Sequence, residues 1–183
     1  CSPAICNICS NLYSKSTIKR HEKIHTPEWI QRQKKKEDAF AKFLKSSGIE
    51  NSRGHHITFS HIRKPNMNED ETKTRCFIDF LVMKNNIMFL VEVDEFQHRE
   101  ANYTVSCDVK RMNDAYTCLL IEENTLPVVF IRFNPDVYKI DGITTRISMK
   151  NRYKAVLDFI TTFKPTNALS VKYFYYDIEN DSL

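Results

Sequence analysis

The chain has 183 residues, a formal net charge of +4 and a pI of about 8.7. No stretch approaches the roughly 18 consecutive apolar residues of a membrane-spanning helix, and no signal peptide with a basic start and an apolar middle is visible. We therefore expect no membrane partner. Residues 1–36 contain eight Lys and Arg but two Glu, and this local surplus favours a polyanionic partner.

The cysteines indicate a compartment and a possible metal site. Cys6 and Cys9 are interpreted as metal ligands, whereas Cys76, Cys107 and Cys118 occur singly within predicted strands or helices and resemble small apolar residues. This usage predicts a reducing intracellular compartment, the nucleus or the cytoplasm. Because the first residue is Cys rather than Met, we also expect upstream sequence.

The first motif in chain order is Cys6-x2-Cys9-x11-His21-x3-His25. Thiolates and imidazoles are the ligands of tetrahedral Zn²⁺, and two histidines one helical turn apart share a face. We therefore expect a structural zinc site in a domain spanning residues 1–26. The motif resembles the Cys2His2 zinc finger, which implies a small ββα fold and a eukaryotic or viral source.

That resemblance also implies DNA or RNA as a partner, and DNA is the partner we predict. Ser14, Thr17 and Arg20 occupy the positions from which the family contacts base edges. The alternative is a metal-stapled knob that only supports folding or binds protein.

A long helix is predicted next, over residues 27–46. Thr26 and Pro27 provide a cap and a first-turn residue, and Gly48 provides a stop. The expected buried stripe of this helix is Phe40, Phe43 and Leu44.

A basic run and one acid precede this buried stripe. The run Lys34, Lys35 and Lys36 is either a solvated face or a phosphate contact. Glu37 shares the edge of the apolar stripe, three residues before Phe40, and is a candidate to point inward.

The remaining pattern predicts a mixed β-sheet flanked by helices, an α/β fold, in a domain spanning residues 27–183. The Lys84-Asn85-Asn86 segment predicts a hairpin turn. The expected strands cover 56–62, 75–83, 87–94, a buried run within 127–136, and 170–177, and the expected helices cover 105–122 and 149–164. The core-facing residues expected on the first of these helices are Val109, Met112, Tyr116 and Leu119 or Leu120.

Three acids stand inside apolar strand patterns: Asp79, Glu92 and Asp94. An ionised carboxylate costs several kcal/mol to bury unless it is compensated. Adjacent strands carrying one acid, and two acids at i and i+2, can bring three oxygens toward a hard cation, so we predict a Mg²⁺ or Mn²⁺ site. The alternative is a structural ion network with the available arginines, which are Arg75, Arg111 and Arg132.

The order of these acids resembles the very-short-patch-repair-like branch of the PD-(D/E)XK restriction-endonuclease superfamily, over roughly residues 34–165. The segments that carry the resemblance are IDF at 78–80, EVDEFQH at 92–98, the pair Asp108 and Arg111, and Arg132-Phe133-Asn134. The resemblance implies a restriction-endonuclease-like fold and a metal-dependent endonuclease that hydrolyses phosphodiester bonds. The implied site residues are Glu37, Asp79, His98 and Asp108, with Glu92, Asp94 and Arg111 beside them.

The residues also suggest individual roles. His98 suits a general base or proton donor, because its ordinary pKa is near 6.5, or it is a capping or core histidine. Asp108 would orient His98 or a water and Arg111 would hold a phosphate oxygen, unless the two form an i, i+3 helix salt pair. Arg132, inside an apolar strand, is expected to pair with a buried acid.

One position departs from the family pattern. The branch usually has Gly after the second strand acid, and this chain has Glu95. Glu95 faces the metal, faces solvent, or marks a site no longer used for cutting. The leading hypothesis is therefore a zinc-finger-targeted DNA endonuclease, either nicking in repair or cutting as a homing or mobile-element enzyme. The alternatives are a nucleic-acid-binding module on an inactive nuclease fold and a zinc-finger scaffold whose main partner is protein.

Overall fold

The computed structural model describes residues 3–8, 12–14, 17–59, 75–95 and 105–177. The chain divides into two compact units, Cys1–Ala39 and Phe40–Leu183. The division falls inside the long helix α2 (Pro27–Ser46), whereas the sequence predicts a boundary just before that helix. Across the described residues, no helix is both long enough and apolar enough to cross a bilayer.

The first unit starts with two short strands followed by a helix. Strand β1 (Pro3–Ile5) pairs antiparallel with β2 (Leu12–Ser14), and Ala4 lies opposite Tyr13. Helix α1 (Ile18–Glu22) follows and continues into a 3-10 turn, η1 (Lys23–His25). The order of elements is therefore ββα, followed by α2.

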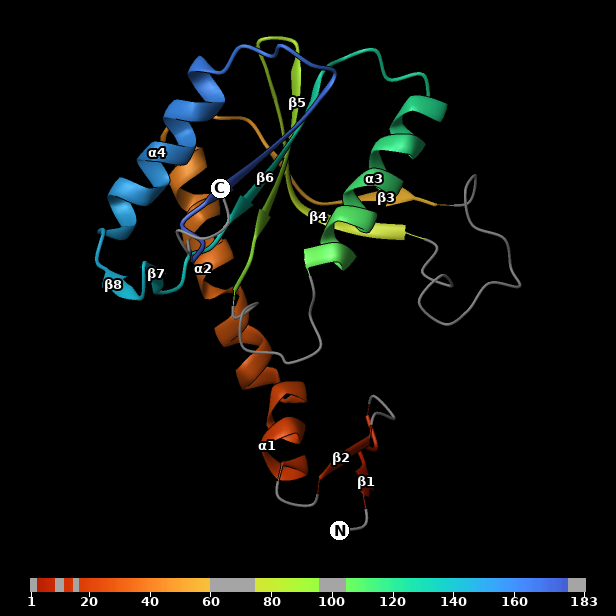
Figure 1. Cartoon of the computed structure of the whole chain (residues 1–183), viewed down its shortest axis with the longest axis vertical. Coiled ribbons are helices and arrows are strands. Elements are labelled where there is room, and N and C mark those ends of the chain that lie inside the picture. The colour runs from red at the N-terminus through yellow and green to blue at the C-terminus, as the bar shows by residue number, and fades with distance from the viewer. Residues whose placement is uncertain (1–2, 9–11, 15–16, 60–74, 96–104, 178–183) are drawn as a thin grey trace. The chain divides into compact units, whose positions relative to one another are not determined.

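The second unit contains a five-stranded mixed sheet in the order β3-β4-β5-β6-β9 (Figure 1). The strands are β3 (Ser52–Thr58), β4 (Arg75–Lys84), β5 (Ile87–Val93), β6 (Val128–Phe133) and β9 (Leu169–Phe174). The first three strands run antiparallel to their neighbours, and β5, β6 and β9 run parallel. The predicted mixed α/β sheet is confirmed.

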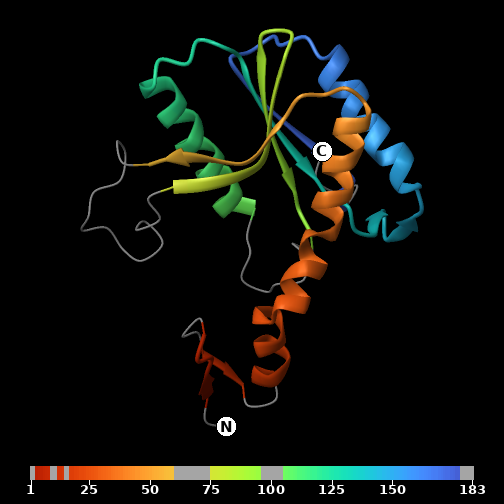
Figure 2. The ribbon, with the colours of Figure 1, turned by 180° about the vertical axis from the view of Figure 1, so that it is seen from behind.

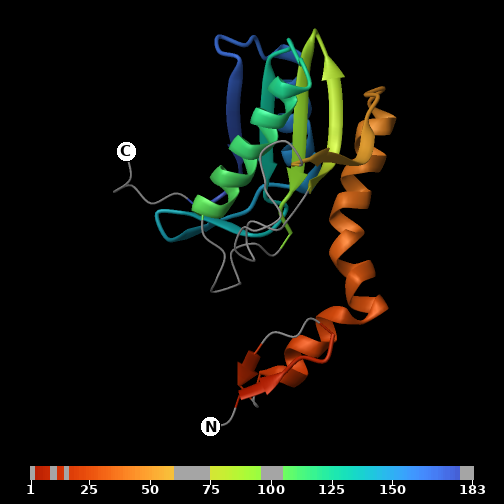
Figure 3. The same ribbon diagram turned by 90° about the vertical axis from the view of Figure 1, so that its right-hand side faces the viewer.

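Helices cover both faces of this sheet. Helix α3 (Val105–Ile121) lies on one face, and α4 (Met149–Thr162) lies on the other, as Figures 1, 2 and 3 show from three sides. The part of α2 from Phe40 onward packs on the same side as α4, where Phe40 and Leu44 are fully buried. The predicted bounds of α2 are confirmed. They could be predicted because capping residues and apolar spacing are signals contained within the segment itself.

Strand β4 contributes to both cores. Phe80 and Val82 pack with α2 and α4, whereas Cys76 and Ile78 pack with α3. Residues of one parity on a flat strand face one side, so β4 must rotate strongly between Ile78 and Phe80. Gly54 of β3, whose φ is +62°, lies between the register pairs that flank this rotation. A glycine reaches that left-handed conformation without a Cβ penalty.

The turn after β4 confirms the predicted hairpin. Asn85 and Asn86 both have positive φ, 52° and 60°, and join Lys84 to its register partner Ile87. Two central residues with positive φ are the requirement of a type I′ turn, and Asn tolerates that conformation.

The start of one strand and the presence of a second hairpin differ from the sequence prediction. Strand β3 begins at Ser52, four residues before the predicted start, and a second hairpin was not predicted at all. That hairpin pairs β7 (Tyr138–Ile140) with β8 (Ile143–Thr145) around Asp141 and Gly142, with φ of 50° and 75°. An Asp-Gly pair between apolar residues is a strong turn signal, but the flanking strands are too short to show periodicity.

The face that α3 buries also differs from the prediction. Val109, expected in the core, is 43% exposed, whereas Asp108 is 6% exposed. Asp108, Met112, Ala115 and Leu119 follow the i, i+4, i+7 and i+11 spacing of one helical face. Asp108 therefore occupies a sheet-facing position, and the next residue, Val109, is turned out by about 100°.

Candidate active site and metal-binding group

Asp79 lies where β4 leaves β5. The β4–β5 register ends with Phe80 opposite Val91, and beyond it the backbone N–H of Val93 donates to Oδ2 of Asp79 at 2.7 Å. The Asp79 carboxylate thus takes the place of a strand carbonyl as the acceptor for a buried N–H. Asp79 consequently has a structural contact, independent of any ligand.

A row of polar side chains crosses the sheet on the face covered by α3. Glu92 of β5 is in register with Arg132 of β6, and Arg132 is in register with Tyr173 of β9. Extending the β4–β5 register by one pair brings Asp79 opposite Glu92. The row lies near the carboxyl ends of three parallel strands, the edge at which α/β sheets usually bind ligands.

Glu92 forms an ion pair with α3. Its Oε1 accepts a hydrogen bond from Nη2 of Arg111 at 2.6 Å, and Glu92 is only 7% exposed. Burial raises the pKa of Glu92 to about 8, although Arg111 acts to lower it and the neighbouring charge of Asp79 raises it further. Arg111 thus pairs with Glu92 on β5, and Asp108 pairs with Arg132 on β6, so both residues of the i, i+3 pair considered from the sequence have a partner on the sheet.

Arg132 is the buried centre of a second ion network. It is 0% exposed, and it donates through Nε to Oδ2 of Asp94 at 2.7 Å and through Nη2 to Oδ2 of Asp108 at 2.9 Å. The two carboxylates raise the pKa of Arg132 against the effect of its burial. The prediction that Arg132 pairs with a buried acid is confirmed.

Tyr176 also contacts Asp94. The Tyr176 hydroxyl donates to Oδ2 of Asp94, the same oxygen that binds Arg132. Burial raises the pKa of Asp94 to about 6, and Arg132 and the Tyr176 hydrogen bond act to lower it. Tyr175, with φ of +66°, precedes Tyr176, and its carbonyl accepts from Nδ2 of Asn134 at 2.8 Å. This turn after β9 brings Tyr176 to the end of β5.

Two carboxylates keep one oxygen outside these contacts. The hydrogen bonds of Asp94 go to Oδ2 and the hydrogen bond of Glu92 goes to Oε1. Within the described part of the chain, Oδ1 of Asp94 and Oε2 of Glu92 accept no hydrogen bond. Both oxygens suit a hard cation such as Mg²⁺, which proteins commonly bind through one or two carboxylates together with water and phosphate.

Each of the three carboxylates predicted to bind a cation has a partner within the protein. Asp79, Glu92 and Asp94 are bonded respectively to a backbone N–H, to Arg111 and to Arg132. The structural ion network that the sequence left open is therefore present, built from Arg111 and Arg132. Arg75 instead lies over the ring of Phe77, with its Cζ 5.6 Å from the ring centroid.

Glu95 does not point freely into solvent. It is half-buried, and its Oε2 is a fully buried atom. Burial raises the pKa of Tyr153, a residue of α4, and the charge of Glu95 raises it further. Glu95 thus interacts electrostatically with Tyr153, which packs on the sheet face opposite the one that carries Glu92.

Several predicted residues fall outside this site. His98, in the motif that follows Asp94, lies outside the described residues, as does Gln97. Glu37 lies on α2 in the first unit and is half-buried. In the basic run, Lys35 is exposed and Lys36 is half-buried, whereas the side chain of Lys34 is outside the described set.

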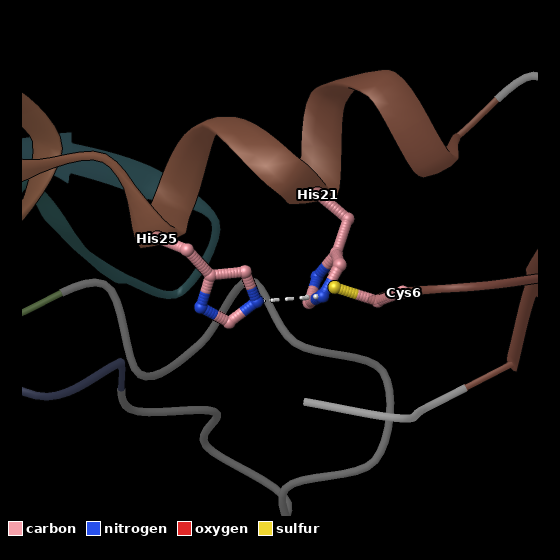
Figure 4. A group of neighbouring side chains, drawn as sticks. All are labelled: Cys6, His21 and His25. Carbon is pink, nitrogen blue, oxygen red and sulfur yellow. Dashed lines mark hydrogen bonds between the residues drawn. The ribbon is translucent and has the colours of Figure 1, made fainter. Parts of the chain in front are cut away.

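The first unit brings together a group that can bind a metal ion: Cys6, His21 and His25 (Figure 4). One ligand atom from each residue lies within 4.8 Å of the others, and the two Nε2 atoms are 3.1 Å apart. Two Zn–N bonds of about 2.0–2.1 Å at a tetrahedral angle place their nitrogens about 3.3 Å apart. The donor set and this spacing fit Zn²⁺. Cys9, the fourth predicted ligand, lies outside the described residues.

Local packing orients one of these ligands. The Tyr13 ring stacks on His21 with centroids 3.8 Å apart and an interplanar angle of 21°. Ser14 and Thr17, two of the predicted base-contacting residues, are exposed and share a hydroxyl hydrogen bond of 2.8 Å. Ser14 ends β2 and Thr17 precedes α1, so Arg20 is the one member of that predicted set inside the helix.

Sequence reasoning missed Tyr173 and Tyr176. Both lie within the predicted final strand, 170–177, and carry no charge, so their sequence gives no sign of a contact with Asp94 or Arg132. The register and the turn at Tyr175 supply those contacts.

Comparison with protein-family models, curated proteins and solved structures finds no match to this chain.

Proposed function

We propose that the chain is a metal-dependent endonuclease that hydrolyses phosphodiester bonds in DNA. The observation that carries the proposal is the row of Asp79, Glu92 and Arg132 at the carboxyl ends of the parallel strands, with Asp94 beside it. Acids at this edge of a sheet are expensive to bury, and ligand oxygens remain on Glu92 and Asp94. The order of acids that resembles the very-short-patch-repair-like nucleases agrees with this placement.

The proposed cation is Mg²⁺ or Mn²⁺, held by Asp79 and Glu92 with Asp94 as a further ligand. When bound, it supplies positive charge at the phosphate and activates water for attack. Arg111 is 35% exposed at its side chain, whereas Arg132 is 0% exposed, and this exposure supports Arg111 as the proposed partner of a phosphate oxygen. Arg132 and Tyr176 orient Asp94, and Asp108 balances the charge of Arg132.

The proton-transfer role remains assigned to His98, four residues beyond Asp94, on the basis of its chemistry alone. A catalytic part for Glu37 likewise rests on the resemblance alone.

In the first unit we propose a structural zinc site completed by Cys9. The support is the convergence of Cys6, His21 and His25, together with the ββα order of elements. This unit would target DNA through Arg20 and the exposed Ser14 and Thr17, with phosphate contacts from Lys34, Lys35 and Lys36. Because one finger covers about three base pairs, it would supply only part of the specificity.

The catalytic proposal is tested by cleavage of supercoiled plasmid with Mg²⁺ or Mn²⁺. Asp79→Asn is the critical variant, because the amide keeps an oxygen that can accept from Val93 N–H but removes the charge. Asp158→Asn, at an exposed position of α4, is the matched control. Cation-dependent cutting that is lost in D79N and kept in D158N supports the enzyme, whereas absence of cutting by the wild type contradicts it.

A second function is favoured by the ion pairs themselves. Because Arg111 and Arg132 neutralise Glu92 and Asp94 without a cation, the fold is also consistent with a nucleic-acid-binding module that does not cut. DNA binding that persists while calorimetry detects no Mg²⁺ or Mn²⁺ binding would select this alternative. If the chain does not bind DNA at either low or high salt concentration, a protein-binding scaffold would be favoured instead.

The zinc proposal has its own test. Elemental analysis is expected to give one zinc per chain, and Co²⁺ substitution is expected to give the absorption of a tetrahedral thiolate site. His25→Ala is expected to abolish both signals, and His56→Ala, at an exposed position of β3, is expected to leave them unchanged.

A further inference from the structure

Phe77 is a large aromatic side chain exposed on the second unit. It lies on β4 and is 58% exposed, while its neighbours Cys76 and Ile78 are buried against α3. Because successive side chains on a strand point to opposite sides, Phe77 points away from α3. Among the described residues, the aromatic side chains that are similarly exposed are Phe77 and Tyr173, and Tyr173 is already part of the polar row.

The surroundings of Phe77 are basic. Arg75 lies over its ring, with Cζ 5.6 Å from the centroid, and the ring of His56, its register partner on β3, is 6.3 Å away. Arg53, also exposed on β3, lies opposite Phe80, three positions further along β4, with its Cζ 5.5 Å from the ring centroid of Phe80. An exposed ring with cations around it matches the chemistry of a nucleic-acid base next to its phosphate.

Phe77 is also close to the proposed catalytic row. It is two residues from Asp79 on the same strand, which corresponds to about 7 Å at the usual rise of a strand. Phe77, Asp79 and Leu81 share one parity on β4, and the rotation of β4 turns this line of residues from the side away from α3 at Phe77 to the α3 side at Leu81. A separation of about 7 Å is twice the ~3.4 Å spacing of successive nucleotides along one DNA strand. A base stacked on Phe77 would thus lie within one or two nucleotides of a phosphate bound at Asp79.

We propose that Phe77 is a stacking platform for an unpaired DNA base beside the cleaved phosphodiester bond. A base within an intact duplex has both faces covered by its neighbours, so an exposed ring on a strand favours DNA whose bases are unstacked. Arg75 and His56 contact the adjoining phosphates. This inference rests on the proposed function and specifies its substrate as DNA with a single-stranded segment.

The test compares Phe77→Leu with the wild-type full chain, without Mg²⁺ or Mn²⁺. Leucine keeps an apolar side chain but removes the ring, and at a 58% exposed position it is expected to fold normally. The affinity for a single-stranded oligodeoxynucleotide is expected to fall about 5- to 100-fold, and the affinity for a duplex is expected to change little. Ile143→Ala, at a 73% exposed position of β8, is the control.

A second measurement locates the base. Single-stranded DNA that contains 5-iodouracil is expected to cross-link to the tryptic peptide from Cys76 to Lys84, which holds Phe77 and the fully buried Phe80. Unchanged single-strand affinity in F77L, or cross-links only to other peptides, would overturn the inference. Because neither measurement requires cleavage, failure of the enzyme proposal is seen separately, as binding and cross-linking without cutting of any substrate.

Discussion

The carboxylate of Asp79 accepts a hydrogen bond from the backbone N–H of Val93, 2.7 Å away, where β4 leaves β5. The Asp79 side chain thus satisfies a backbone N–H at the end of the β4–β5 pairing and is also a proposed ligand of the cation. This double role separates two substitutions that are usually treated as equivalent. Asp79→Ala leaves a buried N–H without its acceptor, whereas Asp79→Asn retains an acceptor oxygen.

Asp79→Ala is expected to lower the free energy of unfolding by about 1–3 kcal/mol, the cost of an unsatisfied buried polar group. Asp79→Asn is expected to cost less than D79A, yet to abolish cation-dependent cleavage as fully. Urea denaturation of both variants, alongside the plasmid assay, checks this. Equal stability of the two variants would show that the Val93 contact contributes nothing.

The second prediction concerns the buried cation Arg132. Arg132→Met is expected to lower the free energy of unfolding by about 3–5 kcal/mol, because Asp94 and Asp108 would lose their shared partner inside the protein. Removing one partner of a buried pair is costly even where the intact pair adds little. Urea denaturation of R132M measures the effect.

A compensated variant is the control for that measurement. In the triple variant R132M, D94N and D108N, no buried charge is left unpaired, so part of the lost stability is expected to return. If the triple variant is less stable than R132M alone by the sum of the separate losses, the three side chains do not form one network.

How far the sequence predicts this fold depends on how local each signal is. Helix α2 and the Asn85-Asn86 turn follow from caps, spacing and turn residues that are close together in the chain. The place of Arg132 inside an apolar strand also predicts a buried acid as its partner. The identity of the acid that pairs with Arg132 depends on the register between strands and on which face of α3 packs on the sheet. Neither can be predicted from a single segment of the sequence.

The same distinction explains the errors at the site. Extending the β4–β5 register by one pair beyond its end brings Asp79 opposite Glu92, so these two acids share one part of the sheet. The pairing of Glu92 with Arg111 and of Asp94 with Arg132 involves residues 19 and 38 positions apart in the chain. Tyr176, 82 positions from Asp94, reaches it only because Tyr175 adopts a positive φ. Such contacts require the assembled sheet.

The rotation of β4 yields a third prediction. Gly54 has φ of +62° and no neighbouring heavy atom where a Cβ would be added, so substitution there tests backbone strain rather than steric overlap. Gly54→Ala is expected to cost about 1–2 kcal/mol, and Gly54→Asn is expected to cost less, because Asn adopts left-handed conformations more readily. Thermal unfolding of both variants measures the difference. Equal losses would show that φ at this position is not the cause.

The raised pKa of Glu92 gives a pH dependence of stability. Because the pKa rises from 4.5 to about 8 on folding, the folded state binds this proton more tightly than the unfolded state. The associated stabilisation is fully present below pH 4.5 and is lost as pH rises through about 8. Each pKa unit corresponds to about 1.4 kcal/mol.

Glu92→Gln is expected to remove this dependence. In buffer without Mg²⁺ or Mn²⁺, the free energy of unfolding of the wild type should fall relative to E92Q between pH 5 and pH 9. Glu50→Gln, at an exposed position, is the control and should follow the wild type. A constant difference between the wild type and E92Q across this range would mean that Arg111 keeps Glu92 ionised throughout.

The last prediction separates a positioning role of Tyr176 from a purely structural one. The Tyr176 hydroxyl donates to Oδ2 of Asp94, and this bond lowers the pKa of Asp94 against the effect of burial. Tyr176→Phe is therefore expected to raise the pKa of Asp94 above about 6, as followed by carbon NMR of the carboxyl group. If the ionised Asp94 acts in cleavage, the rise of the cleavage rate with pH should shift to higher pH in Y176F. A rate that falls equally at every pH, with the Asp94 pKa unmoved, would assign Tyr176 to stability alone.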